Sequence, residues 1–328
     1  MNITVLGAGS WGTALSILLA RNGHDVTLVG RDSEDLAIMK GVRENLHYLP
    51  GFVIPDAVRV VSDDVLDPAD AWIVAVPSGG VRAICARIQG ENPLVVVASK
   101  GLEMGSSMLL TDVVREMRPD ANCGALSGPN LAIEIVRGVP TAAVCAFADP
   151  NVADRVRSAF MCRSFRVYVS ADIVGVELAG ALKNVLAIAA GLSDGLGYGD
   201  NTKGALLARG LHEMASLGLA MGATLDTFLG VAGVGDLFAT AASQLSRNYR
   251  VGRALGEGST LSEALEQVGQ VAEGVPTSEC ALVLARRNGL QMPMFEAADN
   301  VIRGRLRPLD AVSLLMERLP RSESILRK

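Results

Sequence analysis

Short apolar runs alternate with amphipathic segments along the first half of the chain. The runs are rich in Val, Ile, Leu and Ala and are bounded by Gly, Pro, Asn or Asp, a pattern typical of buried strands. We expect strands at 2–7, 25–30, 71–77, 93–99, 123–128 and 141–147, and an edge strand at 165–170. Helices are expected between them, at about 10–22, 33–40, 79–89, 107–117 and 150–160. Continuous apolar strands that alternate with helices predict a parallel sheet covered on both faces.

The pattern changes after residue 170. From Ala171 onward long helical stretches follow one another, without a convincing strand. The expected helices cover 172–192, 202–220, 246–255, 260–268, 277–288 and 294–303. We therefore expect an α/β protein with two domains, an N-terminal parallel-sheet domain over 1–170 and a C-terminal all-helical domain over 171–328.

Composition excludes several classes of protein. The chain is 49% hydrophobic and 20% charged, with a formal net charge of −5, and no basic stretch indicates a nucleic-acid or membrane partner. Five scattered cysteines without CxxC spacing indicate reduced thiols in a cytoplasmic protein, with no zinc site. None of the three histidines stands at metal-ligand spacing, so we expect no metal. The chain starts directly on a strand, without a signal-peptide pattern, and its apolar runs are broken before a membrane span is reached.

The stretch "GAGSWG" follows the first expected strand and opens the first helix. In that context the spacing of Gly7, Gly9 and Gly12 is typical of a Rossmann-type dinucleotide-binding domain. Gly7 permits a tight turn, Gly9 lets a pyrophosphate approach the backbone, and Gly12 allows the helix to pack on the strand. The pyrophosphate would sit at the helix N-terminus, which favours anions. The alternative is a glycine-rich turn that binds nothing.

Other strand ends carry further candidates. Arg31 stands where the residue that reads the cofactor ribose is expected, one residue before Asp32. An arginine there favours NADP, whereas an acidic residue favours NAD; Arg31 as a solvated surface residue is the alternative. In "VVVASKGLE" a strand ends at a loop that holds Lys100, at the sheet edge where ligands bind, although lysines at strand ends are usually solvated. The turn "LSGPN" brings Gly128 to the same edge.

The helical domain contains a lysine in an unusual place. Glu177 is the only other charged residue within 173–192, and Lys183 shares its helical face with small residues. A lysine desolvated on such a face is a plausible general base, whereas a lysine whose head reaches the surface would be structural.

Two later stretches of this domain supply polar groups. "VGD" presents Asp236 where a helix breaks, and "SRN" presents Ser246, Arg247 and Asn248 at a new helix start. Such a fork of donors suits a phosphate monoester, and helix capping by Ser246 or Asn248 beside a surface arginine is an equal alternative.

Taken together, these blocks resemble the bacterial NAD(P)-dependent glycerol-3-phosphate dehydrogenases, from Met1 to about Arg318. The matching blocks are "GAGSWGTAL", "NLHYLPG", "SKGLE", "LSGPN", "ELAGALKNVLAIAAGLSDGLGYGDNTKGALLARGL", "GVGDLFAT", "SRNYRVG" and "AEGVPT". The resemblance implies reversible oxidation of sn-glycerol 3-phosphate to dihydroxyacetone phosphate, a reaction that in reverse feeds phospholipid synthesis. It also suggests a homodimer.

The resemblance assigns roles residue by residue. It implies a proton acceptor at Lys183 and a substrate-holding lysine near the cofactor at Lys100. The implied substrate contacts are Gly128, Asp236, Ser246, Arg247 and Asn248. The implied cofactor contacts are Ser10, Trp11, Arg31, Tyr48, Lys100, Ala132, Arg247, Val271 and Glu273. For Trp11, packing between loop and helix is an equal alternative.

Two positions depart from the family pattern. Asn130 and Leu131 stand where the family usually has Ser or Thr followed by Phe, which puts the substrate contact of Asn130 in question. "GRDSED" also lacks the second basic residue that often follows the arginine of the second strand, and this weakens the expected preference for NADPH over NADH.

The residues and the resemblance lead to one mechanistic hypothesis. Lys183 takes the proton of the C2 hydroxyl while a hydride leaves C2, Lys100 polarises the carbonyl oxygen or orients the substrate, and Arg247 with Asn248 holds the phosphate. Asp236 orients either Lys183 or a substrate hydroxyl. Two alternatives stay open: a two-domain dehydrogenase of a 3-hydroxy acid or sugar acid, and a non-catalytic NAD(P)-sensing module. Activity on carboxylates alone would favour the first, and binding without turnover the second.

Overall fold

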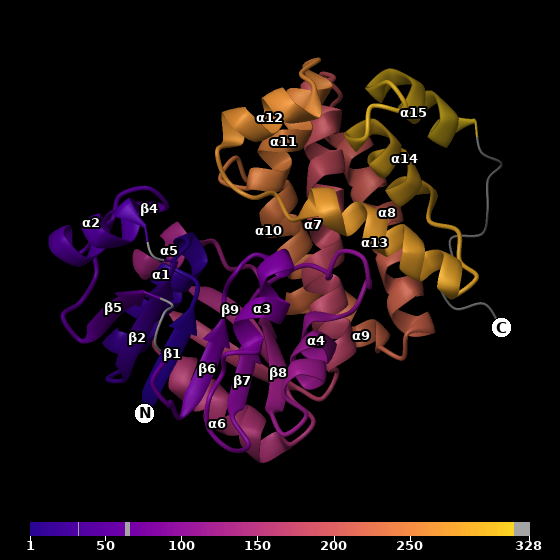
Figure 1. The fold of residues 1–328 in the computed structure, drawn as a ribbon. Helices are drawn as coiled ribbons and strands as arrows, with labels where there is room; N and C mark the ends of the chain where they lie inside the picture. The colour runs from indigo at the N-terminus through magenta and orange to yellow at the C-terminus, as the bar shows by residue number, and fades with distance from the viewer. Residues whose placement is uncertain (32, 63–65, 318–328) are drawn as a thin grey trace. The chain divides into compact units, whose positions relative to one another are not determined.

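The computed structural model describes residues 1–31, 33–62 and 66–317, and the chain divides into two units (Figure 1). Unit 1 comprises Met1–Lys100 and Met108–Ile173, and unit 2 comprises Gly101–Ser107 and the chain from Val174 onward. The sequence-based division at 170/171 assigned residues 101–107 to the first domain, whereas they group with unit 2. Within that unit, Cys280 Sγ and Arg287 Nη1 donate hydrogen bonds to the carbonyls of Glu103 and Ser106.

An eight-stranded sheet forms the centre of unit 1, with strand order β10-β9-β8-β7-β6-β1-β2-β5. The strands are β1 (Asn2–Leu6), β2 (Asp25–Gly30), β5 (Val58–Ser62), β6 (Ala71–Val74), β7 (Leu94–Val97), β8 (Asn122–Ser127), β9 (Thr141–Ala146) and β10 (Phe165–Ser170). β10 lies at the edge, as expected. The expectation of a parallel sheet holds for every neighbouring pair except β8 and β9, which run antiparallel. Burial patterns reveal which face a strand covers but not its direction, so the sequence pattern could not show this reversal.

Two strand regions of unit 1 were not expected. β5 alternates buried and exposed positions at its start instead of being continuously apolar, because it lies at the other sheet edge. β3 (Glu44–Asn45) and β4 (Leu49–Val53) form a small antiparallel hairpin of their own. This hairpin is too short and too polar to produce a periodic signal.

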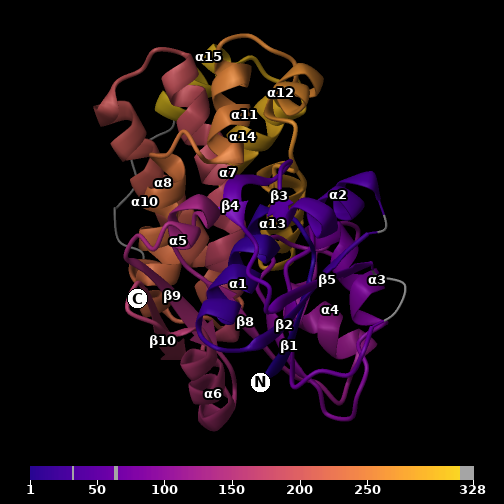
Figure 2. The ribbon, with the colours of Figure 1, turned by 90° about the vertical axis from the view of Figure 1, so that its left-hand side faces the viewer.

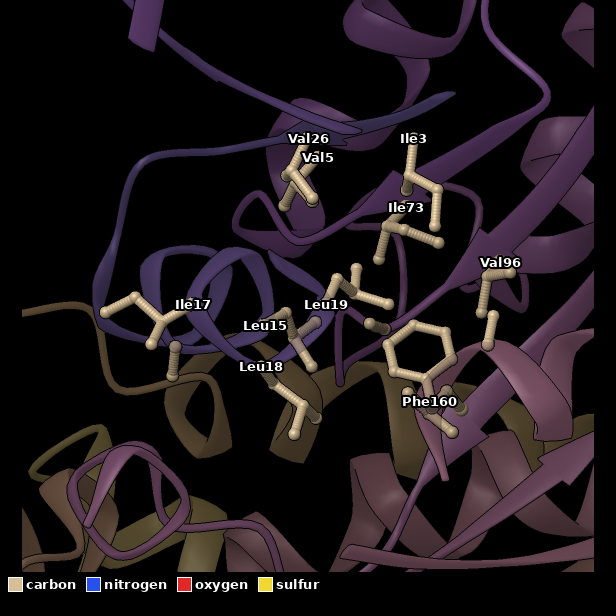
Figure 3. Close-up of a cluster of buried hydrophobic side chains, with 14 of the residues drawn as sticks. Ile3, Val5, Leu15, Ile17, Leu18, Leu19, Val26, Ile73, Val96 and Phe160 are labelled. Atoms are coloured by element: carbon tan, nitrogen blue, oxygen red, sulfur yellow. The ribbon is translucent and has the colours of Figure 1, made fainter. Parts of the chain in front are cut away.

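Helices cover both faces of the sheet, as predicted. The helices are α1 (Ser10–Arg21), α2 (Glu34–Val42), α3 (Val81–Cys85) after the 3-10 turn η1 (Ser78–Gly80), α4 (Leu110–Met117), α5 (Ala132–Val136) and α6 (Pro150–Phe160). One buried cluster joins the strands to α1, α2, α5 and α6; Figure 2 shows α1 and α5 near one another. Figure 3 shows leucines of α1 gathered with residues of β1, β2 and β6 and with Phe160. A second cluster joins the other face to α3 and α4.

In unit 2, all the described regular elements are helical. They are α7 (Ile173–Gly195), α8 (Asp200–Ala220), α9 (Leu225–Leu229), the π-helical turn η2 (Val231–Gly235), α10 (Asp236–Ala241), α11 (Arg247–Gly256), α12 (Leu261–Val268), α13 (Gly274–Arg287), α14 (Pro293–Ile302) and α15 (Pro308–Met316). α9, η2, α10 and α15 were not expected. The glycine-rich sequence around η2 hides any period, and α9 and α10 are short, with five and six residues. α15 lies beyond the last helix that the sequence predicted.

Helix α7 runs through the middle of this helical unit (Figure 1). It is long and apolar enough to cross a membrane, contrary to the expectation that no run reaches that length, but 94% of its most apolar window is buried inside the protein. It is therefore the core helix of unit 2. Glycines let its neighbours approach closely, since a Cβ on Gly252 of α11 would lie 1.9 Å from the carbonyl oxygen of Ile188. All five cysteines, each within the described residues, are free thiols.

Candidate active site

The first group of candidate residues surrounds the glycine-rich loop between β1 and α1. Gly9 is the N-cap of α1, and no side chain caps this helix. The first N–H groups of a helix lack partners within the helix, and together with the helix dipole they favour an anion. The loop therefore offers backbone donors, including that of Ser10, where the sequence placed a pyrophosphate.

The three loop glycines differ in the space around them. Gly7 has a φ of +118°, and a Cβ on it would lie 2.7 Å from the carbonyl oxygen of Ala75. A Cβ on Gly12 would lie 1.8 Å from the carbonyl oxygen of Gly7, whereas one on Gly9 would meet nothing within 4 Å. Gly7 and Gly12 are thus required by the fold itself, while Gly9 leaves open a space that a Cβ would fill. The loop fits a dinucleotide for this reason.

Two side chains anchor the loop to its surroundings. Trp11 donates a hydrogen bond from Nε1 to the carbonyl oxygen of Ala98, at 2.9 Å, and packs against the core cluster of α1. This is the packing role that was the alternative for Trp11. Asn45, at the end of β3, donates from Nδ2 to the carbonyl oxygen of Ala8 and to Thr13 Oγ1. Asn45 is the first residue of the block "NLHYLPG", and no role was expected for it.

The remaining cofactor candidates of unit 1 lie near strand ends. Arg31 is exposed directly after β2, and Asp32, which follows it, lies outside the described residues. The Tyr48 ring is partly buried and stacks with that of His47 at 4.3 Å. Ala132 is the first residue of α5 and packs on the core.

Lys100, Gly128 and Asn130 form a connected group at the ends of β7 and β8. Lys100 Nζ donates to the carbonyl oxygen of Gly128 at 2.8 Å. Asn130 Nδ2 donates to the carbonyl oxygen of Ala142 at 2.9 Å. The other amide atom of Asn130, Oδ1, is buried without a hydrogen-bond partner in the described structure. In this chain Asn130 therefore fastens the turn that carries Gly128 to β9.

The second group of candidates lies in unit 2 and contains the lysine of α7. Lys183 Nζ donates to Asp236 Oδ1 at 2.8 Å and to Thr240 Oγ1, and Thr240 Oγ1 donates to the same carboxylate oxygen. Lys183 is 6% exposed and Asp236 1% exposed. Lys183 therefore does not reach the surface, and Asp236 contacts the lysine. The π-helical turn η2 directly precedes Asp236, and such turns often occur at functional sites.

A chain of amides connects α7 to the start of α11. Asn248 Nδ2 donates to Asn184 Oδ1 at 2.9 Å, and Asn248 Oδ1 accepts from the backbone N–H of Gly274 at 2.9 Å. Asn184 is the residue directly after Lys183, and Gly274 opens α13. Ser246 caps α11 by accepting from the N–H of Tyr249. Ser246 thus has the capping role that the alternative interpretation expected, whereas Asn248 does not cap the helix but bonds to α7 and to the start of α13.

Arg247 differs from its two neighbours. It is partly buried in the first turn of α11, and the described residues provide no hydrogen-bond or ion-pair partner for it. Burial lowers the pKa of the Arg247 guanidinium from its usual value, and the nearby charge of Glu273 opposes this effect. A guanidinium held from water without a partner at a helix N-terminus is a strong anion-binding group. Glu273 is the N-cap residue of α13, and Val271 is 49% exposed just before it.

The structure therefore brings predicted residues together in each unit, Lys100 with Gly128 in unit 1 and Lys183 with Asp236 in unit 2, whereas Arg31 and Val271 are exposed and no hydrogen bond within the described residues joins their side chains to either group. Three contributors were missed as individual residues: Asn45, Asn184 and Thr240. Each lies within a block quoted for the resemblance. A polar residue inside an otherwise apolar stretch was the available signal for Asn184 and Thr240, whereas Asn45 lies in the polar β3–β4 hairpin, which gave none. No group of three or more His, Cys, Asp or Glu side chains suited to a metal occurs in residues 1–31, 33–62 and 66–317.

Comparisons with known proteins identify the family. Residues 2–153 match the N-terminal part, and residues 172–313 the C-terminal part, of NAD-dependent glycerol-3-phosphate dehydrogenase. A glycerol-3-phosphate dehydrogenase [NAD(P)+] of Desulfitobacterium hafniense (strain Y51) is 45% identical over 320 residues, which is 96% of this chain and 91% of that protein. One of Methylibium petroleiphilum is 45% identical over 98% of both chains.

A solved structure agrees with these sequence relatives. The crystal structure of glycerol-3-phosphate dehydrogenase from Coxiella burnetii has a TM-score of 0.93 and 36% identity, and the match covers 97% of this chain and 99% of that one. The shared fold over nearly the whole length, the identity and the two family matches lead to one conclusion: this chain belongs to the NAD(P)-dependent glycerol-3-phosphate dehydrogenase family.

Proposed function

We propose that this protein catalyses the reversible, NAD(P)-dependent interconversion of sn-glycerol 3-phosphate and dihydroxyacetone phosphate. The observation that carries the proposal is the arrangement within unit 2. There a buried lysine–carboxylate pair is linked, through Asn184 and Asn248, to the helix that bears the unpartnered Arg247. A proton-transfer group and a phosphate-binding group on one framework are what a phosphorylated alcohol requires.

Arg247 binds the substrate phosphate in this proposal. Its guanidinium offers several N–H donors in a fixed planar fork, which matches phosphate geometry. Phosphate binding would also offset the cost of holding the charge partly away from water. Ser246 and Asn248 fix the start of α11 through the bonds that their side-chain oxygens accept, while the Ser246 hydroxyl hydrogen and the second Nδ2 hydrogen of Asn248 are donors for the phosphate.

Lys183 handles the proton at C2. In the reductive direction its ammonium group donates a proton to the C2 oxygen, and in the oxidative direction the neutral amine accepts the proton of the C2 hydroxyl. Asp236 and Thr240 hold Nζ in place, so the lysine loses little orientational freedom when substrate binds. Asp236 is therefore assigned to orienting Lys183 and stabilising its charge.

Lys100, held at the carbonyl of Gly128, polarises the carbonyl oxygen or orients the substrate in this assignment. Asn130 supports Lys100 through the Gly128 turn, and we assign it this supporting role in place of a direct substrate contact.

The dinucleotide is held by the glycine loop and by the residues at the strand ends. Gly7, Gly9, Ser10, Trp11 and Gly12 provide the loop. The other proposed contacts are Arg31, Tyr48, Lys100, Ala132, Arg247, Val271 and Glu273. The cofactor supplies the redox chemistry by exchanging a hydride with C2. Arg31 favours NADPH over NADH. We also propose that the protein is a cytoplasmic homodimer that supplies glycerol 3-phosphate for phospholipid synthesis.

The test is reduction of dihydroxyacetone phosphate, followed by loss of NADPH or NADH absorbance with the two cofactors side by side. Turnover is expected with both, faster with NADPH. An Arg31→Ala variant should reduce the NADPH rate more than the NADH rate. Binding of either cofactor without turnover, or turnover only of carboxylate substrates such as a 3-hydroxy acid, would overturn the proposal.

A further inference from the structure

Asn45 is a fully hydrogen-bonded polar side chain beside the glycine loop. It is 2% exposed although it belongs to a short surface hairpin. Its Nδ2 donates to the carbonyl oxygen of Ala8 at 3.0 Å and to Thr13 Oγ1 at 2.8 Å, and its Oδ1 accepts from the backbone N–H of Tyr48 at 3.0 Å. A carboxamide has two N–H donors and one carbonyl oxygen. Each of these groups is therefore engaged.

The partners of Asn45 come from three separate parts of the proposed cofactor site. Ala8 lies inside the loop between Gly7 and Gly9, Thr13 lies in the first turn of α1, and Tyr48 is a proposed cofactor contact. A single buried side chain thus fixes these three segments relative to one another. The free-energy cost of burying the Asn45 carboxamide is offset, because both its nitrogen and its oxygen form hydrogen bonds.

The bond to Ala8 has a specific consequence for Gly9. The peptide group between them is planar and trans, so the carbonyl of Ala8 and the N–H of Gly9 point in opposite directions. Holding the carbonyl toward Asn45 therefore aims the N–H of Gly9 away from it. Glycine is the residue least able to hold such an orientation by itself. Without this anchor the peptide could rotate and turn its carbonyl toward a bound anion.

We propose that Asn45 is a positioning residue for the dinucleotide: it fixes the Ala8–Gly9 peptide so that the loop amides are ready for the pyrophosphate. The inference rests on the proposed cofactor loop and adds a residue that does not itself touch the ligand. It predicts an effect on cofactor affinity, with the proposed substrate contacts left intact.

The experiment compares four proteins. Asn45→Leu keeps the approximate volume and removes all three hydrogen bonds, whereas Thr13→Val keeps the shape of Thr13 and removes one. Leu110→Ala is a matched control, because it weakens the core on the α3–α4 face of the same unit without touching the loop. The dissociation constant of NADPH is measured for each by equilibrium titration, together with the unfolding midpoint and the KM for dihydroxyacetone phosphate at saturating NADPH.

We expect the NADPH Kd to rise about ten-fold in Asn45→Leu and about three-fold in Thr13→Val, because the loss of one net hydrogen bond changes an equilibrium constant roughly two- to ten-fold. Leu110→Ala should lower the unfolding midpoint without changing the Kd, and the substrate KM should stay constant throughout. A wild-type Kd in Asn45→Leu, or an equal rise in Leu110→Ala, would overturn the inference. If Asn45→Leu does not fold, an unchanged Kd in Thr13→Val overturns it. Wild-type protein that binds neither NADPH nor NADH would instead refute the proposed function, and the inference with it.

Discussion

Replacing Lys183 by alanine removes both the proposed proton carrier and the partner of a buried carboxylate. Asp236 is 1% exposed and lies 2.8 Å from Nζ. Removal of one member of a buried ion pair costs about 3–5 kcal/mol, because the remaining charge stays buried. Domains are stable by only about 5–15 kcal/mol. A lower activity of Lys183→Ala alone could therefore reflect unfolding of unit 2.

A double variant separates the two effects. Lys183→Met with Asp236→Leu replaces the pair by apolar groups of similar volume, an exchange that is often neutral or stabilising. We expect this protein to unfold in urea at about the wild-type midpoint, whereas Lys183→Ala should lose about 3–5 kcal/mol. Both should lose about 100- to 10,000-fold in kcat, the usual contribution of general acid–base catalysis.

The assay is steady-state reduction of dihydroxyacetone phosphate at saturating NADPH, with urea unfolding and NADPH binding measured on the same preparations. The NADPH Kd should stay near the wild-type value in both variants. A folded double variant that retains wild-type turnover would refute the role of Lys183 in proton transfer. Loss of cofactor binding in that folded variant would move the lysine from the chemistry to the dinucleotide site.

The remaining predictions concern other parts of the molecule. Gly9→Ala should weaken NADPH binding about 10- to 100-fold, the effect of one overpacked methyl group, at nearly unchanged stability. Gly12→Ala, whose Cβ would lie 1.8 Å from a backbone oxygen, should instead lower the unfolding midpoint; equal stability of the two variants would contradict this. Arg247→Ala should raise the KM for dihydroxyacetone phosphate about 10- to 100-fold, as expected for lost hydrogen bonds to a charged group, while Arg250→Ala, an exposed arginine of the same helix, should leave it unchanged. Burial raises the pKa of Glu213 from 4.5 to about 7. The folded state binds this proton more tightly than the unfolded state, so protonated Glu213 contributes about 3 kcal/mol to the free energy of unfolding. This contribution is full below pH 4.5 and is lost as pH rises through about 7. Urea unfolding measured from pH 4.5 to about 7 should show this decrease in the free energy of unfolding for wild-type protein and not for Glu213→Gln.

The alternating pattern was sufficient to predict the layers of unit 1, because buried strands and amphipathic helices each leave a periodic signal. It did not reveal the antiparallel pairing of β8 with β9, since strand direction depends on how the connection crosses the sheet. The β3–β4 hairpin was missed for a different reason. It is stabilised by individual contacts such as that of Glu44 with the N–H of Gly51, and these have no period.

The candidate site was predictable to a similar degree. Lys183 and the glycine loop are conspicuous in the sequence because a charge interrupts an apolar helix and glycines recur at fixed spacing. The partners of Lys183 were partly hidden: Asp236 was noted, but Thr240 follows one turn later in an ordinary helical segment. Asn184 and Asn248 are far apart in sequence, and only the folded unit shows that their amides bond to each other.

The assignment of residues 101–107 to unit 2 has a consequence for recombination between related enzymes. The chain passes from one unit to the other at 100/101, at 107/108 and at 173/174. A chimera joined at the last of these points alone would combine one parent's helices with the other parent's seven-residue segment. The bonds from Cys280 and Arg287 to the carbonyls of Glu103 and Ser106 use the backbone of that segment, and Cys280 also bonds to the side chain of Ser107, so the segment tolerates different side chains, Ser107 excepted, but not a different loop length. Exchange of the helical unit between relatives should therefore succeed where the segment has equal length in both parents, and otherwise only when the segment is transferred with the helices.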